Sequence, residues 1–263
     1  MNFFKIVLLL FIFTSSSSQA IAKIYISKTS ANEKVYLLNQ KSVRVGNGVL
    51  SWFSIENDID LTLLNHFYLC NGKEAKLSIN RRTSSILINE GDKGIHNYIS
   101  SQSLPTGVAP WINIQDTDEL KEMGQVACKK VASEDEGYLL PLTQSSYDKT
   151  NTSEISALMS GTFLKRGELI EGWLKIYRVF YKKINAVDQK KGRIYFPELK
   201  NDGFDLIQIS VNCALNKLSL MRLVKYDQGR QVIDDHKYKV DYESPVPDST
   251  SSVIIVNICK IYN

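Results

Sequence analysis

The sequence predicts an α+β protein of two similar domains, each an antiparallel β-sheet with a C-terminal helix. The first observation is an internal repeat: residues 42–55 (SVRVGNGVLSWFSI) match residues 163–176 (FLKRGELIEGWLKI) without a gap. The second is a pair of cysteines at matching places in each copy, and the third is the alternation of apolar and polar residues through both copies. Equivalent positions under this alignment are Arg44 and Lys165, Gly46 and Gly167, Trp52 and Trp173, and Ile55 and Ile176.

The first 22 residues form a predicted signal peptide. A positive n-region, Met1–Lys5, precedes an eight-residue apolar run, Ile6–Phe13, which is too short to span a membrane. Ala20 and Ala22 supply the small side chains of a cleavage site, so the mature chain is expected to begin near Lys23. No later stretch approaches the ~20 apolar residues of a spanning helix. We therefore expect an exported protein, in the periplasm or on the outer surface of a bacterium.

Alternating residues predict that most of the mature chain is β-strand. Val43–Val45 and the strand through Trp52 flank a Gly-Asn-Gly hairpin turn at residues 46–48. In the second copy, Leu169–Lys182 is one long expected strand, with Trp173, Tyr177, Val179 and Tyr181 on one face. Further strands are expected at 67–70, 75–80, 85–88, 193–196, 206–213, 218–225 and 231–240, with turns at 90–94 and 227–229.

Each copy is expected to end in a helix, although the pattern is clear only in the first. Asp116 precedes Glu119 by three residues, the spacing of a capping box, and Leu120, Met123, Ala127 and Val131 then recur on one helical face. At the end of the second copy, the β-branched run Val253–Val256 favours a strand by propensity. The repeat favours a helix at the same place. Both alternatives stay open from the residues, and the repeat tips the choice to helix.

The four cysteines of an exported chain predict two disulfides. Cys70 and Cys213 lie in the middle of their copies, each soon followed by the letters Lys-Leu-Ser, and Cys128 and Cys259 lie near the ends. Three pairings are possible, and Cys70–Cys128 with Cys213–Cys259 follows if each repeat folds alone. Each bond would close a loop of ~50 residues and stabilise its domain by roughly 4 kcal/mol. The expected boundaries are domain 1 at 23–130, a linker at 131–153, with residues 139–142 as a first strand, and domain 2 at 154–263.

The sequence carries no catalytic signature. It has no G-x-S-x-G, H-E-x-x-H, P-loop or dinucleotide fingerprint, so we expect neither an enzyme nor a cofactor. A metal site is not expected, because there is no C-x-x-C and the three histidines, His66, His96 and His236, share no ligand spacing. Glu56, Asp58 and Asp60 alternate and would suit calcium on one strand face, but a solvated loop is the favoured interpretation.

A basic insertion is the candidate ligand-binding segment. From Trp173 to Cys213 the second copy is much longer than the first is from Trp52 to Cys70. The extra residues could contact an anionic surface, such as a sulfated polysaccharide or lipopolysaccharide phosphates, and the alternative is a solubilising loop. Over the whole chain, 32 basic residues nearly balance 28 acidic ones, which argues against nucleic-acid binding. The candidate residues are Lys182, Lys183, Lys190, Lys191 and Arg193.

Several of these residues together resemble the surface-adhesin protein E family. The resemblance rests on the run Val35–Val43, the glycine before the tryptophan strand, the mid-domain cysteine, Trp111 with Ile114, and Leu120 before Cys128. It covers 34–128, and 159–259 less closely. It implies a sheet with a C-terminal helix tethered across one face by the cysteine pair. It also implies a bacterial surface protein that binds host matrix proteins.

These observations lead to two functional expectations. The first is a non-enzymatic, exported envelope or surface binding protein, adhesin-like, whose partner is an unknown macromolecule such as a host matrix protein or an anionic envelope glycan. The second is a periplasmic enzyme or enzyme inhibitor with a site between the domains. A cleft that gathers His, Asp and Ser would favour the enzyme, and an exposed aromatic or basic patch would favour binding. Trp52 and Trp173 are both expected to be buried in the core.

Overall fold

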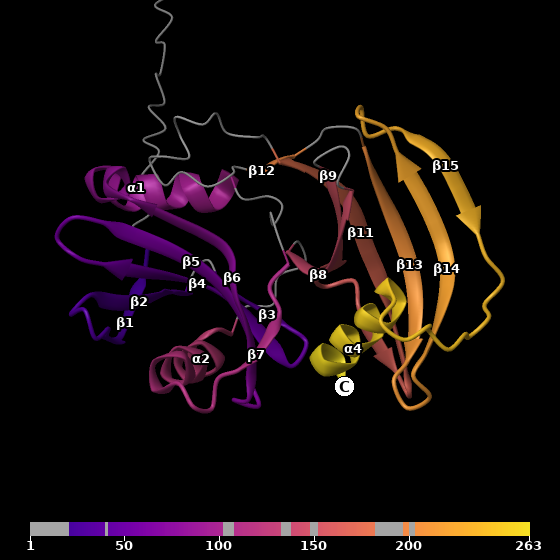
Figure 1. The fold of residues 1–263 in the computed structure, drawn as a ribbon, viewed down its shortest axis with the longest axis horizontal. Coiled ribbons are helices and arrows are strands. Elements are labelled where there is room, and N and C mark those ends of the chain that lie inside the picture. Colours follow the sequence, from indigo (N-terminus) through magenta and orange to yellow (C-terminus); the bar gives the residue numbers. More distant parts are fainter. Residues whose placement is uncertain are drawn as a thin grey trace, which may run out of the picture.

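The protein contains two antiparallel β-sheets, each followed along the chain by a helix, which confirms the predicted fold class (Figure 1). The structure is a computed structural model that describes residues 21–39, 42–101, 108–132, 138–147, 152–181, 197–199 and 203–263. The sheets hold seven and eight strands. None of the helices within these ranges is long and apolar enough to cross a membrane.

The first sheet has the spatial order β1-β2-β4-β5-β6-β7, with β3 paired to β4. The side chains of its strands point alternately to the two faces of the sheet. Each face is covered by a helix, so the first domain has three layers (Figure 1). The elements are β1 (Lys23–Lys28), β2 (Lys34–Leu38), β3 (Val43–Val45), β4 (Gly48–Glu56), β5 (Leu61–Leu69), β6 (Glu74–Ser84), α1 (Ser85–Ser101), β7 (Trp111–Asn113) and α2 (Asp118–Lys130).

The two helices cover opposite faces of this sheet. The predicted face of α2 is confirmed: Met123 and Ala127 are buried with Phe53 of β4 and Tyr68 of β5. The helix is capped by Thr117, without a side-chain cap bond, so the capping box predicted at Asp116 is wrong.

Helix α1 was not predicted. The sequence favoured a strand at 85–88 and a turn at 90–94, whereas both segments lie within α1. The turn signal nevertheless had a physical origin, because Gly91 has a non-helical backbone with φ 54° and interrupts the helix. Ile95 and Ile99 of α1 then pack on the sheet face that carries Trp52.

The second sheet has the order β15-β14-β13-β11-β9-β8, with β10 and β12 paired to β11. It begins within the stretch expected as a linker, where Leu139 and Leu140 open β8. The elements are β8 (Leu139–Tyr147), β9 (Thr152–Met159), β10 (Leu164–Arg166), β11 (Leu169–Tyr181), β12 (Pro197–Leu199), β13 (Phe204–Asn212), β14 (Lys217–Tyr226), β15 (Val232–Lys237) and α4 (Thr250–Tyr262).

Strand register shows that the two domains are copies of one unit. Gly48 of β4 pairs with Leu69, the residue before Cys70, and Leu169 of β11 pairs with Asn212, the residue before Cys213. Counting along β4 and β11 from these pairs makes Trp52 and Trp173 equivalent, as the sequence predicted. Both copies also bulge at the same two strand pairs, β1–β2 with β8–β9 and β5–β6 with β13–β14.

The shared Lys-Leu-Ser letters are not equivalent positions. Ala75 pairs with Tyr68, two residues before Cys70, and Leu218 pairs with Val211, two residues before Cys213. Lys76 therefore matches Ser219, and the triplets are displaced by two residues. A shift of two keeps side chains on the same face of a strand, which is why the letters still looked alike.

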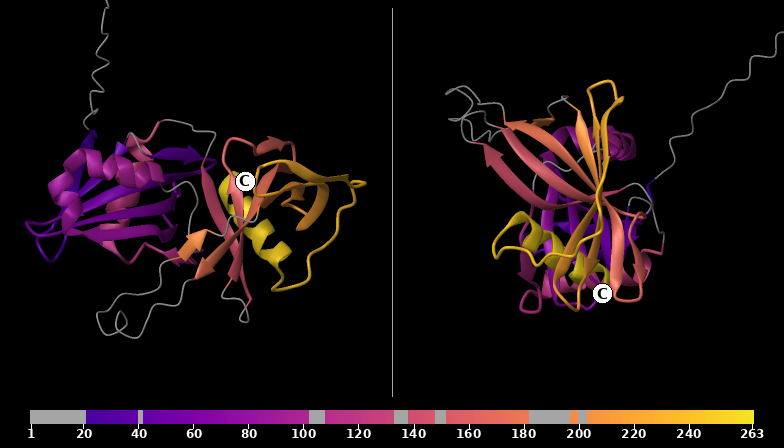
Figure 2. Two further views of the ribbon diagram at one scale, coloured as in Figure 1. Left: turned by 90° about the horizontal axis from the view of Figure 1, so that it is seen from above. Right: turned by 90° about the vertical axis from the view of Figure 1, so that its right-hand side faces the viewer.

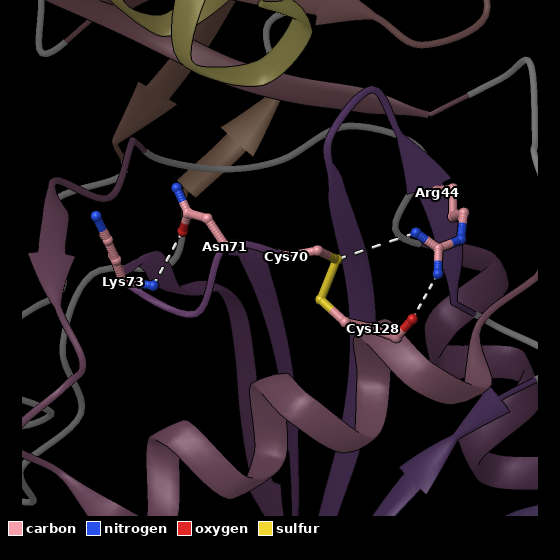
Figure 3. Close-up of a disulfide and its surroundings, with 5 residues drawn as sticks. All are labelled: Arg44, Cys70, Asn71, Lys73 and Cys128. Atoms are coloured by element: carbon pink, nitrogen blue, oxygen red, sulfur yellow. Dashed lines mark hydrogen bonds between the residues drawn. A yellow bond between two sulfur atoms is a disulfide. The ribbon is translucent and has the colours of Figure 1, made fainter.

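Both predicted disulfides are present, and each joins the end of a central strand to the helix that closes its copy. Cys70 bonds Cys128 and Cys213 bonds Cys259. Figure 3 shows that Arg44 of β3 lies over the first bond and donates to the Cys128 carbonyl at 2.5 Å. A cation at this place neutralises part of the negative end of the α2 dipole. Its equivalent, Lys165, donates to Asn263 at the end of α4.

Helix α4 packs between the two sheets (Figure 1). Ile255, Ile258 and Ile261 belong to one apolar cluster that contains residues of both sheets. Members from the second sheet include Leu174, Ile209 and Val211, and members from the first include Val45, Leu50, Phe67 and Leu69. Leu50 is on the same face of β4 as Trp52, so α4 covers the part of that face which α1 leaves. The first domain therefore completes its core with a helix of the second.

Polar contacts fix the same junction. The Trp111 indole donates to Asn257 of α4 at 2.8 Å, and Lys260 forms an ion pair with Glu74 at 2.6 Å. The Asn47 amide donates to the Ile261 carbonyl at 2.6 Å. These contacts hold the two domains in one arrangement.

Candidate functional site

The equivalent faces of the two sheets are covered differently. In the first copy, β6 reaches the next strand, β7, through α1, which folds back over Trp52; the Trp52 and Tyr98 rings meet edge to face at 6.0 Å. In the second copy, the corresponding segment forms β15, which extends the sheet beside β14. The chain then returns to the edge of β14 where Glu243 pairs with Leu218, the position at which Ile112 pairs with Ala75 in the first copy.

The consequence is that Trp173 is not a core residue. Trp52 is 3 % exposed, as predicted, whereas Trp173 is half-buried and belongs to none of the apolar clusters of the described residues. The prediction that both tryptophans are buried is therefore wrong for Trp173. The backbones match, because each tryptophan amide donates to a hydroxyl of the preceding segment, Ser42 or Thr162. The difference is that α1 covers Trp52 in the first copy, whereas no equivalent helix of the described chain covers Trp173 in the second.

Strand register arranges side chains in a grid on this surface, which we name the Trp173 face. In the register, Trp173 pairs with Gln208 and Lys175 pairs with Leu206. Gln208 and Leu206 pair in turn with residues of β14, which pair with residues of β15. Figure 2 (left) shows β14 and β15 at the end of the molecule farthest from the first sheet. Two rows run from β11 to β15, Trp173-Gln208-Arg222-Lys237 and Lys175-Leu206-Val224-Asp235, and the third, Phe204-Tyr226-Val232, runs from β13 to β15 with Tyr177 of β11 in the same apolar cluster as Phe204.

An aromatic stack crosses the middle of the Trp173 face. The rings of Phe204 and Tyr226 are parallel, with centroids 4.6 Å apart. The Lys175 ammonium also lies over the Phe204 ring, 4.1 Å from its centroid. Cation–π attraction stabilises this position, more so for a partly desolvated cation. The stack fixes where the positive charge of Lys175 is presented.

Positive charge predominates on this face. Burial, and secondarily the charge of Arg230 in the β14–β15 turn, lower the pKa of Lys175 below its ordinary value. A lowered pKa marks a cation that would gain from an anionic partner. Arg222 and Asp235 neutralise each other through a two-pronged ion pair, with distances of 2.8 and 2.5 Å.

One edge of the Trp173 face is closed. Tyr177 and Val179, at the far end of β11, are 3 % and 0 % exposed and pack with Ile155, Ala157 and Val108. The accessible part therefore begins at Trp173 and Lys175 and runs toward β15, whose residues are all exposed. At the start of β15, Val232 and Ile233 are 54 % and 66 % exposed.

The predicted basic hairpin cannot be placed against this face. Lys182, Lys183, Lys190, Lys191 and Arg193 lie outside the described residues. The structure describes the start and end of this insertion, where Tyr181 ends β11 and β12 pairs back to it. The prediction for the basic hairpin therefore stays a prediction.

The residues that could have suggested catalysis or calcium are separated. His66 is buried between Phe53 and Tyr68, whereas His96 and His236 are exposed on other elements. Within the part of the chain that the structure describes, no group of three His, Cys, Asp or Glu side chains could hold a metal ion.

Glu56, Asp58 and Asp60 do not share a strand face, which confirms the favoured interpretation of a loop. β4 ends at Glu56, and the next four residues form the turn to β5. Asn57 organises this turn by accepting from the amides of Ile59 and Asp60. Glu56 is already paired with Lys23 at 2.7 Å.

Sequence reasoning missed Lys175, Phe204 and Tyr226 as site residues. A signal was present for Lys175, since it stands two residues after Trp173 and a strand places such residues on one face. Phe204 and Tyr226 could be joined to it only through the register. In comparisons with family models, curated proteins and solved structures, nothing matches this chain.

Proposed function

We propose that this protein is an exported, non-enzymatic binding protein of a bacterial envelope, and that its second domain contacts a macromolecule through the Trp173 face. The observation that carries the proposal is the difference in covering between equivalent surfaces. The first copy buries its tryptophan under α1, whereas the second leaves Trp173, Lys175 and the Phe204–Tyr226 stack accessible. Exposed aromatic side chains are enriched where proteins bind partners.

Export is supported by two independent features. The N-terminal residues have the organisation of a signal peptide, and all four cysteines are in disulfides, which persist in oxidising compartments. The absence of a helix that could span the membrane among the described residues is compatible with this location. The resemblance to surface-adhesin protein E adds the expectation of a bacterial surface, and an adhesin-like role rests on that resemblance alone.

A binding role is favoured over the enzyme or inhibitor alternative by the arrangement of polar groups. The described histidines are on three separate elements. The Trp173 face instead offers an aromatic and cationic surface, the feature that we expected of a binding protein.

The test compares three proteins immobilised on beads and exposed to envelope extract. They are the mature chain, Trp173→Ser, and Lys225→Gln as a control on the opposite face of the second sheet. The proposal expects at least one envelope component that the parent and the control retain and Trp173→Ser loses. The same set of retained components on all three proteins would overturn it. Circular dichroism verifies that each variant is folded, and osmotic-shock release of a chain that begins near Lys23 tests export.

A further inference from the structure

We infer that the Trp173 face binds an anionic polysaccharide, with a sugar ring against the Trp173 indole and carboxylate or sulfate groups against Lys175 and Arg230. The inference rests on the proposed function and names the ligand class of that surface. It is carried by the net charge, the aromatic geometry and the extent of the grid.

The charge of the Trp173 face fits an anion. Three cations, Lys175, Arg222 and Lys237, stand in the grid with a single carboxylate, Asp235, and the adjacent turn adds one charge of each sign, Arg230 and Asp227, so the net charge stays positive. Arg222 is paired with Asp235, and at the β10 end of the same face Arg166 lies 3.9 Å from Glu171. The charge of Arg230 adds to burial in lowering the pKa of Lys175. An anionic partner would offset this positive charge.

The aromatic geometry favours a sugar over a nucleic acid. Proteins bind single-stranded nucleic acids by stacking bases on free aromatic faces. Here Phe204 and Tyr226 already stack on each other, and the Lys175 ammonium lies over the Phe204 ring. Trp173 has no ring partner among the described residues and is half-buried. A pyranose ring can place its C–H groups on such an indole while its hydroxyls reach Gln208 and Arg222 in the same row.

The extent of the surface favours a polymer. Two of the rows cross four strands, and with strands ~4.8 Å apart each of these rows is about 14 Å long. A small ligand would need a concave site that encloses most of its surface. The cavity beside Leu218 and Leu220 lies on the α4 side of the second sheet. An extended chain can instead gain affinity from several weak contacts along one row.

The experiment measures binding of four probes by isothermal titration at low salt. The probes are a heparin octasaccharide, an oligogalacturonate, neutral dextran and polyglutamate. The proposal expects binding of at least one of the two anionic saccharides, weakening as salt shortens the Debye length to about 8 Å at physiological ionic strength. Heparin alone would identify sulfate as the recognised group, and oligogalacturonate would identify carboxylate. Dextran and polyglutamate are expected not to bind.

Matched variants locate the site. Lys175→Gln and Lys225→Gln remove the same charge from opposite faces of one sheet, because Lys225 lies beside Asp234 on the α4 side. Lys175→Gln should weaken saccharide binding about tenfold, whereas Lys225→Gln should change it less than twofold. Arg230→Asn should weaken binding to a similar degree as Lys175→Gln, and asparagine tolerates the positive φ of 63° at this position. Trp173→Ser should abolish the part of the saccharide binding that persists at high salt.

The outcomes separate this inference from the proposed function. Equal binding of polyglutamate and the saccharides would overturn the polysaccharide and leave an acidic protein partner. No binding of either anionic saccharide, together with an envelope component that depends on Trp173, would also overturn this inference while the proposed function stands. Equal losses in Lys175→Gln and Lys225→Gln would show that general charge, and not this face, attracts the ligand.

Discussion

The two copies show how one sheet and one disulfide can serve different ends. In the first copy, α1 and α4 cover the face that carries Trp52, and α2 covers the other. In the second copy, α4 covers one face and the equivalent of α1 is replaced by β15. The difference arises in a single connection between equivalent strands. A repeat that keeps its framework can therefore gain an accessible surface by changing one connector.

The helices that end the two copies, α2 and α4, also differ in how they are covered. α2 buries Met123 and Ala127 and exposes charged residues on its outer side. α4 is far more apolar and buries Ile254, Ile255 and Ile258, because both sheets pack against it. Its one buried polar side chain, Asn257, accepts from the Trp111 indole. The first domain thus depends on the second for part of its core, and the second presents the accessible face.

Replacing each tryptophan by alanine is the strongest test of the comparison. Trp52→Ala should lower the free energy of unfolding by about 3–5 kcal/mol, since it empties a site enclosed by Ile95 and Ile99 of α1. Trp173→Ala should lower it by about 1–2 kcal/mol, because the half-buried side chain buries less apolar area than Trp52. Urea unfolding measures both values. Equal losses would contradict the difference in covering.

Much of the fold was predictable because local signals and the repeat agreed. The hairpin at 46–48, the long strand β11, both disulfides and α2 follow from turn residues, alternation and cysteine positions. The helix α4 was predictable only through the repeat. Its β-branched residues favour a strand by propensity, and tertiary burial between two sheets outweighs that preference.

The misses have a common physical cause. Gly91 breaks the helical periodicity of α1, so its contact with Trp52 could not be seen without the sheet. The exposure of Trp173 depends on a helix that is missing from the second copy. The stack of Lys175, Phe204 and Tyr226 joins three strands that are distant in sequence. Register and covering are properties of the assembled sheet, and single segments do not encode them.

Equivalent glycines sharpen the comparison at the domain junction. Gly46 and Gly167 both have positive φ, 56° and 63°. A Cβ at Gly46 would lie 2.4 Å from the Ile261 carbonyl oxygen of α4, whereas at Gly167 nothing lies within 4 Å. Gly167→Ala should therefore cost only backbone strain, about 1 kcal/mol, and Gly46→Ala about 3 kcal/mol because α4 must move as well. Thermal unfolding of the two variants measures the difference. Equal decreases in the melting temperature would mean that α4 does not pack closely against the β3–β4 hairpin.

Lys76 and Ser219 form the last informative pair, because equivalent positions carry a cation in one copy and a hydroxyl in the other. Lys76 is 2 % exposed, lies 5.0 Å from the centre of the Trp111 ring and donates to the Ala109 carbonyl at 2.9 Å. Burial, and then the charge of Lys260, lower its pKa from 10.5 to about 8. The domain junction thus contains an ammonium that folding disfavours.

This arrangement predicts a dependence of stability on pH. Below pH 8 Lys76 is charged in both states and the unfavourable effect on folding is complete. Between pH 8 and the unfolded value of 10.5 the folded state releases its proton first, so stability rises by up to 1.36 kcal/mol per pH unit, about 2 kcal/mol between pH 8 and 9.5. Burial raises the pKa of Tyr68 and Tyr262 above their ordinary value of 10, so ionisation of these groups in the unfolded state begins to destabilise the fold as the pH approaches 10, and the test therefore ends at pH 9.5. Urea unfolding at pH 7.5, 8.5 and 9.5 measures the rise in stability.

Lys76→Met should abolish this rise, and Lys260→Met should shift it to higher pH by removing the neighbouring charge. A parent protein whose stability is constant across this window would show that the junction does not hold a buried charge.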